Sequence, residues 1–540
     1  MSVDVEQAVA SPVEHRPGLP FPDRPTFRGW DHPTRLEGDI FDLEIVQGSI
    51  PRELRGRFYS IAPETQFSPR LGDDVMFNGD GMIRMFTIAD GHVDYRSRYV
   101  MTEKLRAERA KRRALFGAYR NPFTDDPSVK GLNRGNANTA MVFHGGKLLA
   151  LKEDARPVAV DPVTLETEGE WTYDGDLTSL TSTAHPKIDQ RTGELFFFGY
   201  EAKGLVTRDI AYNVADADGR ITHEAWLQAP YVGFMHDFVV SDDYVIFPVF
   251  PATAELARLQ AGGMHWRWDP KRDTYLGVMP RYGSPGELRW VTGPPRYGFH
   301  FFNASNDGTT ITIEGCLGEA ITSPFLYPDT CGNPIDPRKA VTRITRWTLD
   351  FDNPEAGFQE ETLGSQFAEF PMIDPRAQTM RQRVGFVPVR TPGNRHALVN
   401  GVPAPGSGGR GLDTLFSDWG DSQHPDVPAP GSGGRGLDAV VRYDFVEDRE
   451  VALFLAGPDS TVQEPMFVPR GPDAEEGDGW LVLLVNRWDT MLNDLVIVDT
   501  ADMAAGPVAT ASLPMRLHSG IHTLWIDEAA ATEEALDEQR

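Results

Sequence analysis

The fold class is decided by short apolar runs such as Glu194-Leu-Phe-Phe-Phe-Gly-Tyr200 and Asp243-Tyr-Val-Ile-Phe-Pro-Val-Phe250. Similar runs occupy residues 146–152 and 479–485, and turn residues such as Asp218-Gly219 separate the runs along the 540-residue chain. With 52 glycines and 42 prolines, the composition suits many short strands better than long helices. Strands at this density predict an all-β fold that is closed or radially repeated. No clean sequence repeat is visible, so strand density and length, not periodicity, favour a propeller.

The strand pattern extends over residues 36–526, which we expect to form a single domain. Residues 1–35 are Pro-rich and polar and predict a flexible lead-in, while residues 527–540 predict an acidic tail. Two helical segments, residues 102–117 and 253–260, interrupt the strands, and the first opens on a threonine that can act as an N-cap. We expect both helices to lie outside the sheets, over one face.

Charge and cysteine content exclude several classes of protein. A net charge of -27 argues against a nucleic-acid partner and against attraction to an anionic membrane surface. No stretch reaches 18 uninterrupted apolar residues, and the N-terminus carries Asp4, Glu6 and Glu14, so neither a membrane span nor a signal peptide is expected. Only two cysteines, Cys316 and Cys331, are present, which predicts reduced thiols in a cytoplasmic protein and not a disulfide framework.

One segment is duplicated. Val402-Pro-Ala-Pro-Gly-Ser-Gly-Gly-Arg-Gly-Leu-Asp413 recurs letter for letter at residues 427–438. A flexible surface loop that tolerated a duplication accounts for this pattern. A phosphate-binding glycine loop is disfavoured, because no Gly-Lys-Ser/Thr and no helical pattern follow the glycines. His424 lies between the copies and is a loop histidine, not a candidate ligand.

Four of the 13 histidines lie in apolar, strand-like surroundings. They are His185, His236, His300 and His522. A lone buried histidine is usually a core residue with a satisfied hydrogen bond, but burying several polar rings without a shared purpose is costly. No local motif links the four, so they can meet only if the fold brings distant strand ends together, as a propeller axis would. Four neutral imidazoles would suit a divalent transition metal.

Three glutamates also stand beside apolar residues, in Ala150-Leu-Lys-Glu153, Phe367-Ala-Glu369-Phe-Pro and Gln463-Glu464-Pro-Met-Phe. Each could be a surface residue at a strand end. A histidine that binds metal through one nitrogen must donate its other N–H, however, and carboxylates are the natural acceptors. The three glutamates are therefore candidate partners of the histidines.

Together these segments resemble, in order, those of the carotenoid cleavage oxygenase family. The resemblance extends over residues 36–526 and rests on the following segments: Ala137-Asn-Thr139, Ala150-Leu-Lys-Glu153, Thr183-Ala-His185-Pro-Lys187, Met235-His236-Asp237, Phe299-His300, Glu369-Phe-Pro371, Glu464-Pro-Met-Phe-Val-Pro469 and Ile521-His522. Within the family, the run Leu115-Phe-Gly-Ala-Tyr119-Arg-Asn-Pro-Phe-Thr-Asp-Asp-Pro-Ser-Val129 is typical of bacterial lignostilbene dioxygenases and isoeugenol monooxygenases.

The resemblance implies a seven-bladed β-propeller, with a few helices and long loops capping the active-site face. It also implies one iron(II) per molecule, held by the four histidines, with Glu153, Glu369 and Glu464 bracing three of them. Thr139 resembles the family threonine that crowds a vacant iron position with its side chain.

The implied activity is cleavage of the alkene double bond of 4-hydroxyphenyl alkenes with O2, giving aromatic aldehydes such as vanillin. Phe77, Tyr119 and Lys152 match the substrate pocket of this branch, where the tyrosine and lysine hold the phenol oxygen. Lys152 would stabilise a phenolate by its charge, and Tyr119 by a hydrogen bond. The expected partners are therefore a small phenolic alkene and O2, without nucleic acid and without integral membrane contact.

The sequence leaves two other functions open. An apocarotenoid-cleaving oxygenase would need a long apolar tunnel without a polar anchor, against which Lys152 and Tyr119 argue. A propeller with a structural metal could instead be a binding scaffold. The sequence leaves open which phenylpropanoid or stilbene is the substrate, whether the outcome is that of a monooxygenase or a dioxygenase, and the oligomeric state.

Overall fold

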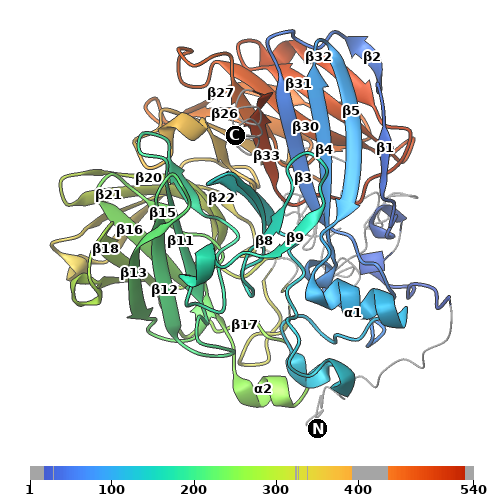
Figure 1. Ribbon diagram of the computed structural model, residues 1–540. Helices are drawn as coiled ribbons and strands as arrows, with labels where there is room; N and C mark the ends of the chain where they lie inside the picture. The colour runs from blue at the N-terminus through green and yellow to red at the C-terminus, as the bar shows by residue number, and fades with distance from the viewer. Residues whose placement is uncertain are drawn as a thin grey trace.

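The computed structural model describes residues 18–391 and 436–528, apart from residues 28, 323, 324, 326 and 337. In this part of the protein, seven antiparallel sheets of four to six strands form a seven-bladed β-propeller (Figure 1). The predicted all-β propeller fold is therefore confirmed. Figure 1 also places the helices α1 (Glu103–Lys111) and α2 (Leu256–Gln260) on the same side of the molecule, outside the sheets.

Four sheets are four-stranded meanders, each built from consecutive strands. Their strands are β6 (Ala140–His144), β7 (Lys147–Leu151), β8 (Val158–Val160) and β9 (Thr167–Glu170); β10 (Lys187–Asp189), β11 (Glu194–Tyr200), β12 (Asp209–Ala215) and β13 (Ile221–Gln228); β20 (Tyr297–Asp307), β21 (Thr310–Gly318), β22 (Arg343–Asp350) and β23 (Phe358–Thr362); and β24 (Met372–Ile373), β25 (Val384–Val389), β26 (Ala439–Asp444) and β27 (Arg449–Leu455).

A fifth sheet is formed by a further continuous stretch of sequence. Its strands are β14 (Gly233–Phe234), β15 (Val239–Val240), β16 (Tyr244–Thr253), β17 (Arg267–Trp268), β18 (Thr274–Pro280) and β19 (Arg289–Gly293).

The remaining two sheets combine early strands with late ones. One contains β1 (Gly38–Ile40), β3 (Gly56–Pro63), β4 (Gly81–Ala89), β5 (His92–Tyr99) and β33 (Thr523–Asp527); the other contains β2 (Glu44–Gly48), β28 (Ser460–Val462), β29 (Met466–Pro469), β30 (Gly479–Arg487), β31 (Leu492–Asp499) and β32 (Pro507–Ser512). Pairing of β33 with β3 and of β2 with β32 joins the early strands to the late ones and closes the ring of blades.

The strands predicted from apolar runs are found almost residue for residue. β11 has the predicted bounds, and β7, β16 and β30 coincide with the other three runs within a few residues. In β11, six of the seven residues are buried. Central strands of a blade are covered on both faces by neighbouring blades, so their sequences are continuously apolar instead of alternating.

The two helices are shorter than predicted. Thr102 caps α1 as expected, because its side-chain oxygen accepts the amide hydrogen of Leu105 at 3.2 Å. The helix ends at Lys111 and not at Gly117, because Arg112 adopts a left-handed conformation with φ of 53°. The start predicted for the second helix at residue 253 is also wrong, since Thr253 belongs to β16.

The predicted domain boundaries stay predictions. Trp30, near the end of the expected lead-in, is fully buried and lies 4.7 Å from Trp488 between ring centroids. Of the duplicated segment, residues 402–435 and with them His424 lie outside the described residues, whereas Leu437, near the end of the second copy, is fully buried.

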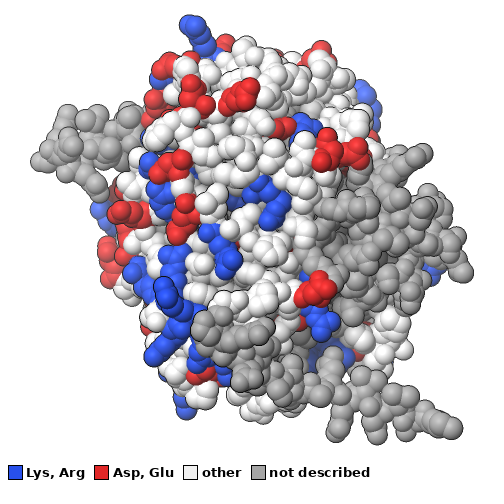
Figure 2. Space-filling model, turned by 90° about the vertical axis from the view of Figure 1, so that its right-hand side faces the viewer, with Lys and Arg blue, Asp and Glu red and all other residues white. Residues whose placement is uncertain are grey.

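Surface charge and helix length bear on the partners of the protein. Among the described residues, no helix is long and apolar enough to cross a membrane. Along one side of the face in Figure 2, lysine and arginine side chains lie beside aspartate and glutamate side chains.

Candidate metal centre

The four histidines of the sequence analysis come from four different blades and meet at the centre of the propeller. His300 lies within β20, and His236 lies in the loop between β14 and β15. His185 and His522 lie just before the first residues of β10 and β33. Three of the four therefore stand beside strand ends, in line with the expectation that distant strand ends meet at a propeller axis.

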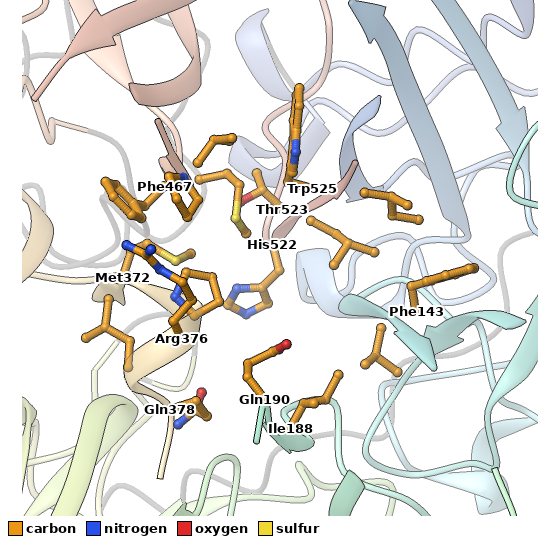
Figure 3. Close-up of a pocket in the computed structure, with 18 of the residues that line it drawn as sticks. Phe143, Ile188, Gln190, Met372, Arg376, Gln378, Phe467, His522, Thr523 and Trp525 are labelled. Carbon is orange, nitrogen blue, oxygen red and sulfur yellow. The ribbon is translucent and has the colours of Figure 1, made fainter. Parts of the chain in front are cut away.

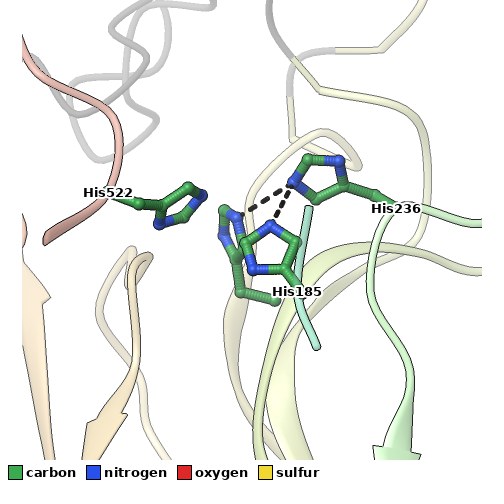
Figure 4. A group of neighbouring side chains, drawn as sticks. His185, His236 and His522 are labelled. Atoms are coloured by element: carbon green, nitrogen blue, oxygen red, sulfur yellow. Dashed lines mark hydrogen bonds between the residues drawn. The ribbon is translucent and has the colours of Figure 1, made fainter. Parts of the chain in front are cut away.

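The ring nitrogens of these histidines converge. One nitrogen from each ring lies within 4.8 Å of those of the others. The Nε2 atom of His236 is 2.9 Å from that of His185 and 3.2 Å from that of His300 (Figure 4). The Nε2 atom of His522 is buried and has no hydrogen-bond partner. An unpaired buried nitrogen beside three others fits a cation that all four could share.

The electrostatics favour neutral imidazoles. Burial, followed by the positive charge that the neighbouring histidines would carry, lowers the pKa of His185 and of His300 well below the usual value. Neutral rings have a free lone pair, which is the form that binds a metal. The residues present therefore fit a divalent metal ion.

Three carboxylates accept hydrogen bonds from the Nδ1 atoms of three of these histidines. The Nδ1 atom of His236 lies 2.6 Å from Glu153, that of His300 lies 2.7 Å from Glu369, and that of His522 lies 2.8 Å from Glu464. Each Nδ1–H therefore donates to a glutamate, which leaves Nε2 free to bind a metal. The family resemblance implied that these glutamates brace three of the histidines, and the structure places Glu153 beside His236, Glu369 beside His300 and Glu464 beside His522.

The glutamates are in different environments. Burial raises the pKa of Glu369 to about 8. Burial acts in the same direction on Glu153, but His236 and then Arg120 outweigh it, and the pKa of Glu153 falls to about 2. Glu369 accepts the amide hydrogen of the following residue, Phe370, at 3.0 Å.

A cavity of about 720 Å³ opens on one side of the histidines. His185, His300 and His522 line it, together with residues of the edge strands of several blades, including Phe143, Met372 and Trp525 (Figure 3). His236 is not among its lining residues.

The predicted substrate residues lie together. The Nζ atom of Lys152 donates to the main-chain oxygen of Phe77 at 2.8 Å and lies 4.9 Å from the centroid of the Tyr119 ring. Lys152 and Tyr119 are both buried. Burial lowers the pKa of Lys152 and raises that of Tyr119 well above the usual value, so Tyr119 stays protonated and can donate a hydrogen bond.

Two aromatic residues that the sequence analysis did not identify connect this group to the histidines. The Phe325 ring lies 5.7 Å from Tyr119 and 6.0 Å from Phe77, between centroids. The Phe299 ring lies 6.3 Å from Phe77 and 5.1 Å from His236. Phe299 immediately precedes a candidate ligand in the sequence, which could have pointed to it, whereas no local signal distinguishes Phe325.

Thr139 lies directly before β6 and is buried. Its hydroxyl donates to the side-chain oxygen of Asn138 at 3.0 Å, and the Asn138 amide donates to the main-chain oxygen of Phe77 at 2.9 Å. Thr139 is thus joined to the loop that carries Phe77. Its role beside a metal stays a prediction.

The family model described as retinal pigment epithelial membrane protein matches residues 31–527. The chain belongs to the carotenoid cleavage oxygenase family. With relatives named as monooxygenases and dioxygenases, the chain is an oxygenase that cleaves carbon–carbon double bonds, as the family resemblance implied.

Relatives within the family agree with the predicted branch. The chain is 43% identical over 496 residues to an isoeugenol monooxygenase of Pseudomonas nitroreducens, covering 92% of this chain and 96% of the relative. It is 39% identical to the lignostilbene-alpha,beta-dioxygenase isozyme III of Sphingomonas paucimobilis, covering 94% and 98%. The crystal structure of a Pseudomonas brassicacearum lignostilbene dioxygenase matches with a TM-score of 0.85 at 36% identity, covering 94% of this chain and 100% of that one.

Proposed function

We propose that the protein is a non-haem iron(II) dioxygenase that cleaves the alkene double bond of 4-hydroxyphenyl alkenes, of the lignostilbene or isoeugenol type, to aromatic aldehydes. The observation that carries this proposal is the buried pair of Tyr119 and Lys152 beside an aromatic wall that reaches His236. The names of the isoeugenol- and lignostilbene-cleaving relatives support the same substrate class. An apocarotenoid substrate has no phenol oxygen to which Tyr119 and Lys152 could bind.

The metal would be one iron(II) per molecule, held by His185, His236, His300 and His522. When bound, it supplies a site at which dioxygen is activated for reaction with an electron-rich alkene. The neutral imidazoles leave the ion its full positive charge. Two free cysteines, Cys316 and Cys331, support the cytoplasm as the compartment.

The residues around Tyr119 and Lys152 would bind and ionise the phenol. Burial lowers the pKa of Lys152, which favours the neutral amine, and the neutral amine is the form that can accept the phenol proton at Nζ. The resulting ammonium has three donors, so it can keep its bond to the oxygen of Phe77 and still donate to the phenolate. Tyr119 adds a second hydrogen bond, and the ionised ring pushes electron density toward the alkene.

Phe77, with Phe299 and Phe325, would hold the substrate ring and exclude water between the phenol and the histidines. In a dry pocket, the lysine–phenolate pair is stronger than in water. Thr139 would restrict access to one position on the metal.

The test is incubation of the iron-loaded protein with a panel of hydroxylated alkenes in air, followed by detection of aromatic aldehydes. The proposal expects aldehyde from 4-hydroxystilbene or isoeugenol and none from the metal-free protein. Cleavage of an apocarotenoid with no turnover of any phenolic alkene would contradict the proposal.

A further inference from the structure

The glutamate that braces His236 is held differently from the other two. Glu369 accepts the amide hydrogen of Phe370 at 3.0 Å, and Glu464 accepts that of Thr523 at 2.5 Å. In both cases a main-chain donor fixes the carboxylate. Among the hydrogen bonds of the described residues, Glu153 has no main-chain donor, so side chains must supply that function.

Those side chains are two tyrosines and one arginine. The Oε1 atom of Glu153 accepts the hydroxyl hydrogen of Tyr200 at 3.2 Å and that of Tyr119 at 3.4 Å. A guanidinium nitrogen of Arg120 lies 3.6 Å from the same oxygen, while Oε2 accepts the Nδ1–H of His236. One carboxylate oxygen therefore faces the metal ligand, and the other faces Arg120 and the tyrosines.

Arg120 is itself tightly placed. It is 4% exposed, its guanidinium donates to the Tyr200 hydroxyl at 2.9 Å and to the Glu201 carboxylate, and it lies 5.1 Å from the centroid of the Trp266 ring. His265, which is fully buried, also contacts this group, since its Nε2 lies 3.1 Å from the same Glu201 oxygen that accepts from Arg120. These contacts hold the guanidinium of Arg120 beside Glu153.

A buried cluster of charged groups like that around Arg120 adds little to the stability of the fold. Burying an arginine with two carboxylates costs solvation that the ion pairs barely recover, and apolar replacements are often as stable. Charged groups buried at this cost point to a positional role, and Glu153 is one of the carboxylates concerned.

The backbone couples this cluster to the phenol-binding residues. Tyr119 and Arg120 are consecutive, as are Lys152 and Glu153, and Tyr119 packs against Lys152 while Arg120 pairs with Glu153. Arg120 has φ of 50°, a left-handed conformation that is unfavourable for a residue with a side chain. Non-glycine residues held in this region are concentrated at functional sites.

We propose that Arg120, supported by Tyr200 and Glu201, is a positioning residue that fixes the Glu153 carboxylate and through it the ring of His236. This inference rests on the proposed metal centre. Arg120 faces the carboxylate oxygen of Glu153 that does not contact His236, so it acts on the metal ligand through Glu153.

The test compares three variants by their binding of cobalt(II), which has the charge of iron(II) and an absorption spectrum that reports ligand geometry. Arg120→Met removes the charge at similar length, and Arg120→Lys keeps it. The matched control is Arg281→Met, because Arg281 is also buried and paired with a carboxylate, Asp189 at 2.8 Å, but this carboxylate has no hydrogen bond to a candidate ligand among the described residues. The dissociation constant for cobalt, the visible spectrum and the melting temperature are measured for each.

We expect Arg120→Met to weaken cobalt binding about 10–100-fold and to shift the spectrum, which is the usual effect of losing a group behind a ligand. Arg120→Lys should recover most of the affinity, and Arg281→Met should bind cobalt like the wild type even if it melts earlier. If Arg120→Met does not fold, Glu201→Gln, which removes the partner of Arg120, should change the spectrum in the same direction.

Wild-type affinity and spectrum in Arg120→Met, or in Glu201→Gln where that variant is used, would overturn the inference. An equal loss of affinity in Arg120→Met and Arg281→Met would also overturn it, since general destabilisation would then suffice. A wild-type protein that binds no cobalt would instead overturn the metal centre itself.

Discussion

Replacement of Lys152 by methionine tests the phenol anchor most directly. The change removes the amino group, which would accept the phenol proton and carry the positive charge, and keeps a flexible apolar side chain of similar length. The Phe77 loop should keep its place, because the oxygen of Phe77 also accepts hydrogen bonds from Asn138 at 2.9 Å and Asn136 at 3.2 Å. The effect should therefore fall on the substrate and not on the fold.

The size of the effect follows from the burial of Lys152. A hydrogen bond to a charged group contributes about 1.5–3 kcal/mol, which corresponds to a loss of roughly 10–150-fold in kcat/KM. Loss of phenolate activation adds to this, and sites built to pair a hydroxyl discriminate by up to about 10⁴–10⁵ against analogues that lack it. The wild-type enzyme should likewise turn over 4-hydroxystilbene and fail on its 4-methoxy analogue, which cannot ionise.

The assay is the rate of aldehyde formation from the hydroxy and methoxy substrates, with bound iron measured in parallel. Lys152→Met should lower turnover of the hydroxy substrate sharply while iron content is unchanged. Lys104→Met is a suitable control, because Lys104 is also buried, but its amino group pairs with the carboxylates of Asp80 and Glu108 and not with a residue assigned to the phenol site. Equal rates on both substrates in the wild type, or an unchanged preference in Lys152→Met, would refute the phenol anchor.

Three further predictions concern the metal, the duplicated loop and pH. Replacing each of the four histidines in turn by alanine should abolish bound iron and turnover, and Glu369→Gln or Glu464→Gln should weaken metal binding about 10–100-fold; full activity in any histidine variant would remove that residue from the site. Deletion of residues 402–426 restores one copy of the repeated sequence and should leave a folded protein, since loop length costs only about 0.6 kcal/mol per doubling; a fall in melting temperature by tens of degrees would contradict this. Burial raises the pKa of Asp74 from 3.8 to about 6, so the folded state retains a proton that the unfolded state releases, and the stabilisation contributed by this proton should be lost as pH rises from about 4 to about 6. The free energy of unfolding of the wild type relative to that of Asp74→Asn, measured by denaturant titration, should therefore fall over this range, and parallel curves would exclude a contribution from Asp74.

Local sequence was sufficient for the strands but not for the end of the first helix. β11 could be predicted because a strand buried on both faces is continuously apolar. The first helix was predicted to reach Gly117, yet the Glu108 carboxylate accepts the amide hydrogens of Leu115 at 2.8 Å and Phe116 at 3.1 Å. The Glu108 carboxylate thus takes the place of the main-chain oxygens that would accept these hydrogen bonds in a further helical turn. Helix propensity cannot predict such a contact.

Local sequence is also insufficient to decide which buried histidines belong to the site. The four converging histidines could be chosen by their apolar neighbours, but His265 also stands beside apolar residues, Met264 and Trp266, and is fully buried. It contacts Glu201 and not the converging nitrogens. Apolar context indicates that a histidine is buried, whereas its partner decides its role, and that partner is set by the fold.

The position of His236 predicts a role in turnover for the cluster around Arg120. His236 is the candidate ligand that does not line the cavity, and its ring lies 5.1 Å from that of Phe299 in the aromatic wall. The Tyr119 hydroxyl has one hydrogen, which it donates to Glu153 at 3.4 Å. When a phenolate occupies the proposed pocket, that hydrogen must turn toward the substrate, and Glu153 loses a donor. Tyr200 and Arg120 remain beside the same carboxylate oxygen, so they can hold Glu153, and with it His236, at the moment when Tyr119 is engaged by the substrate.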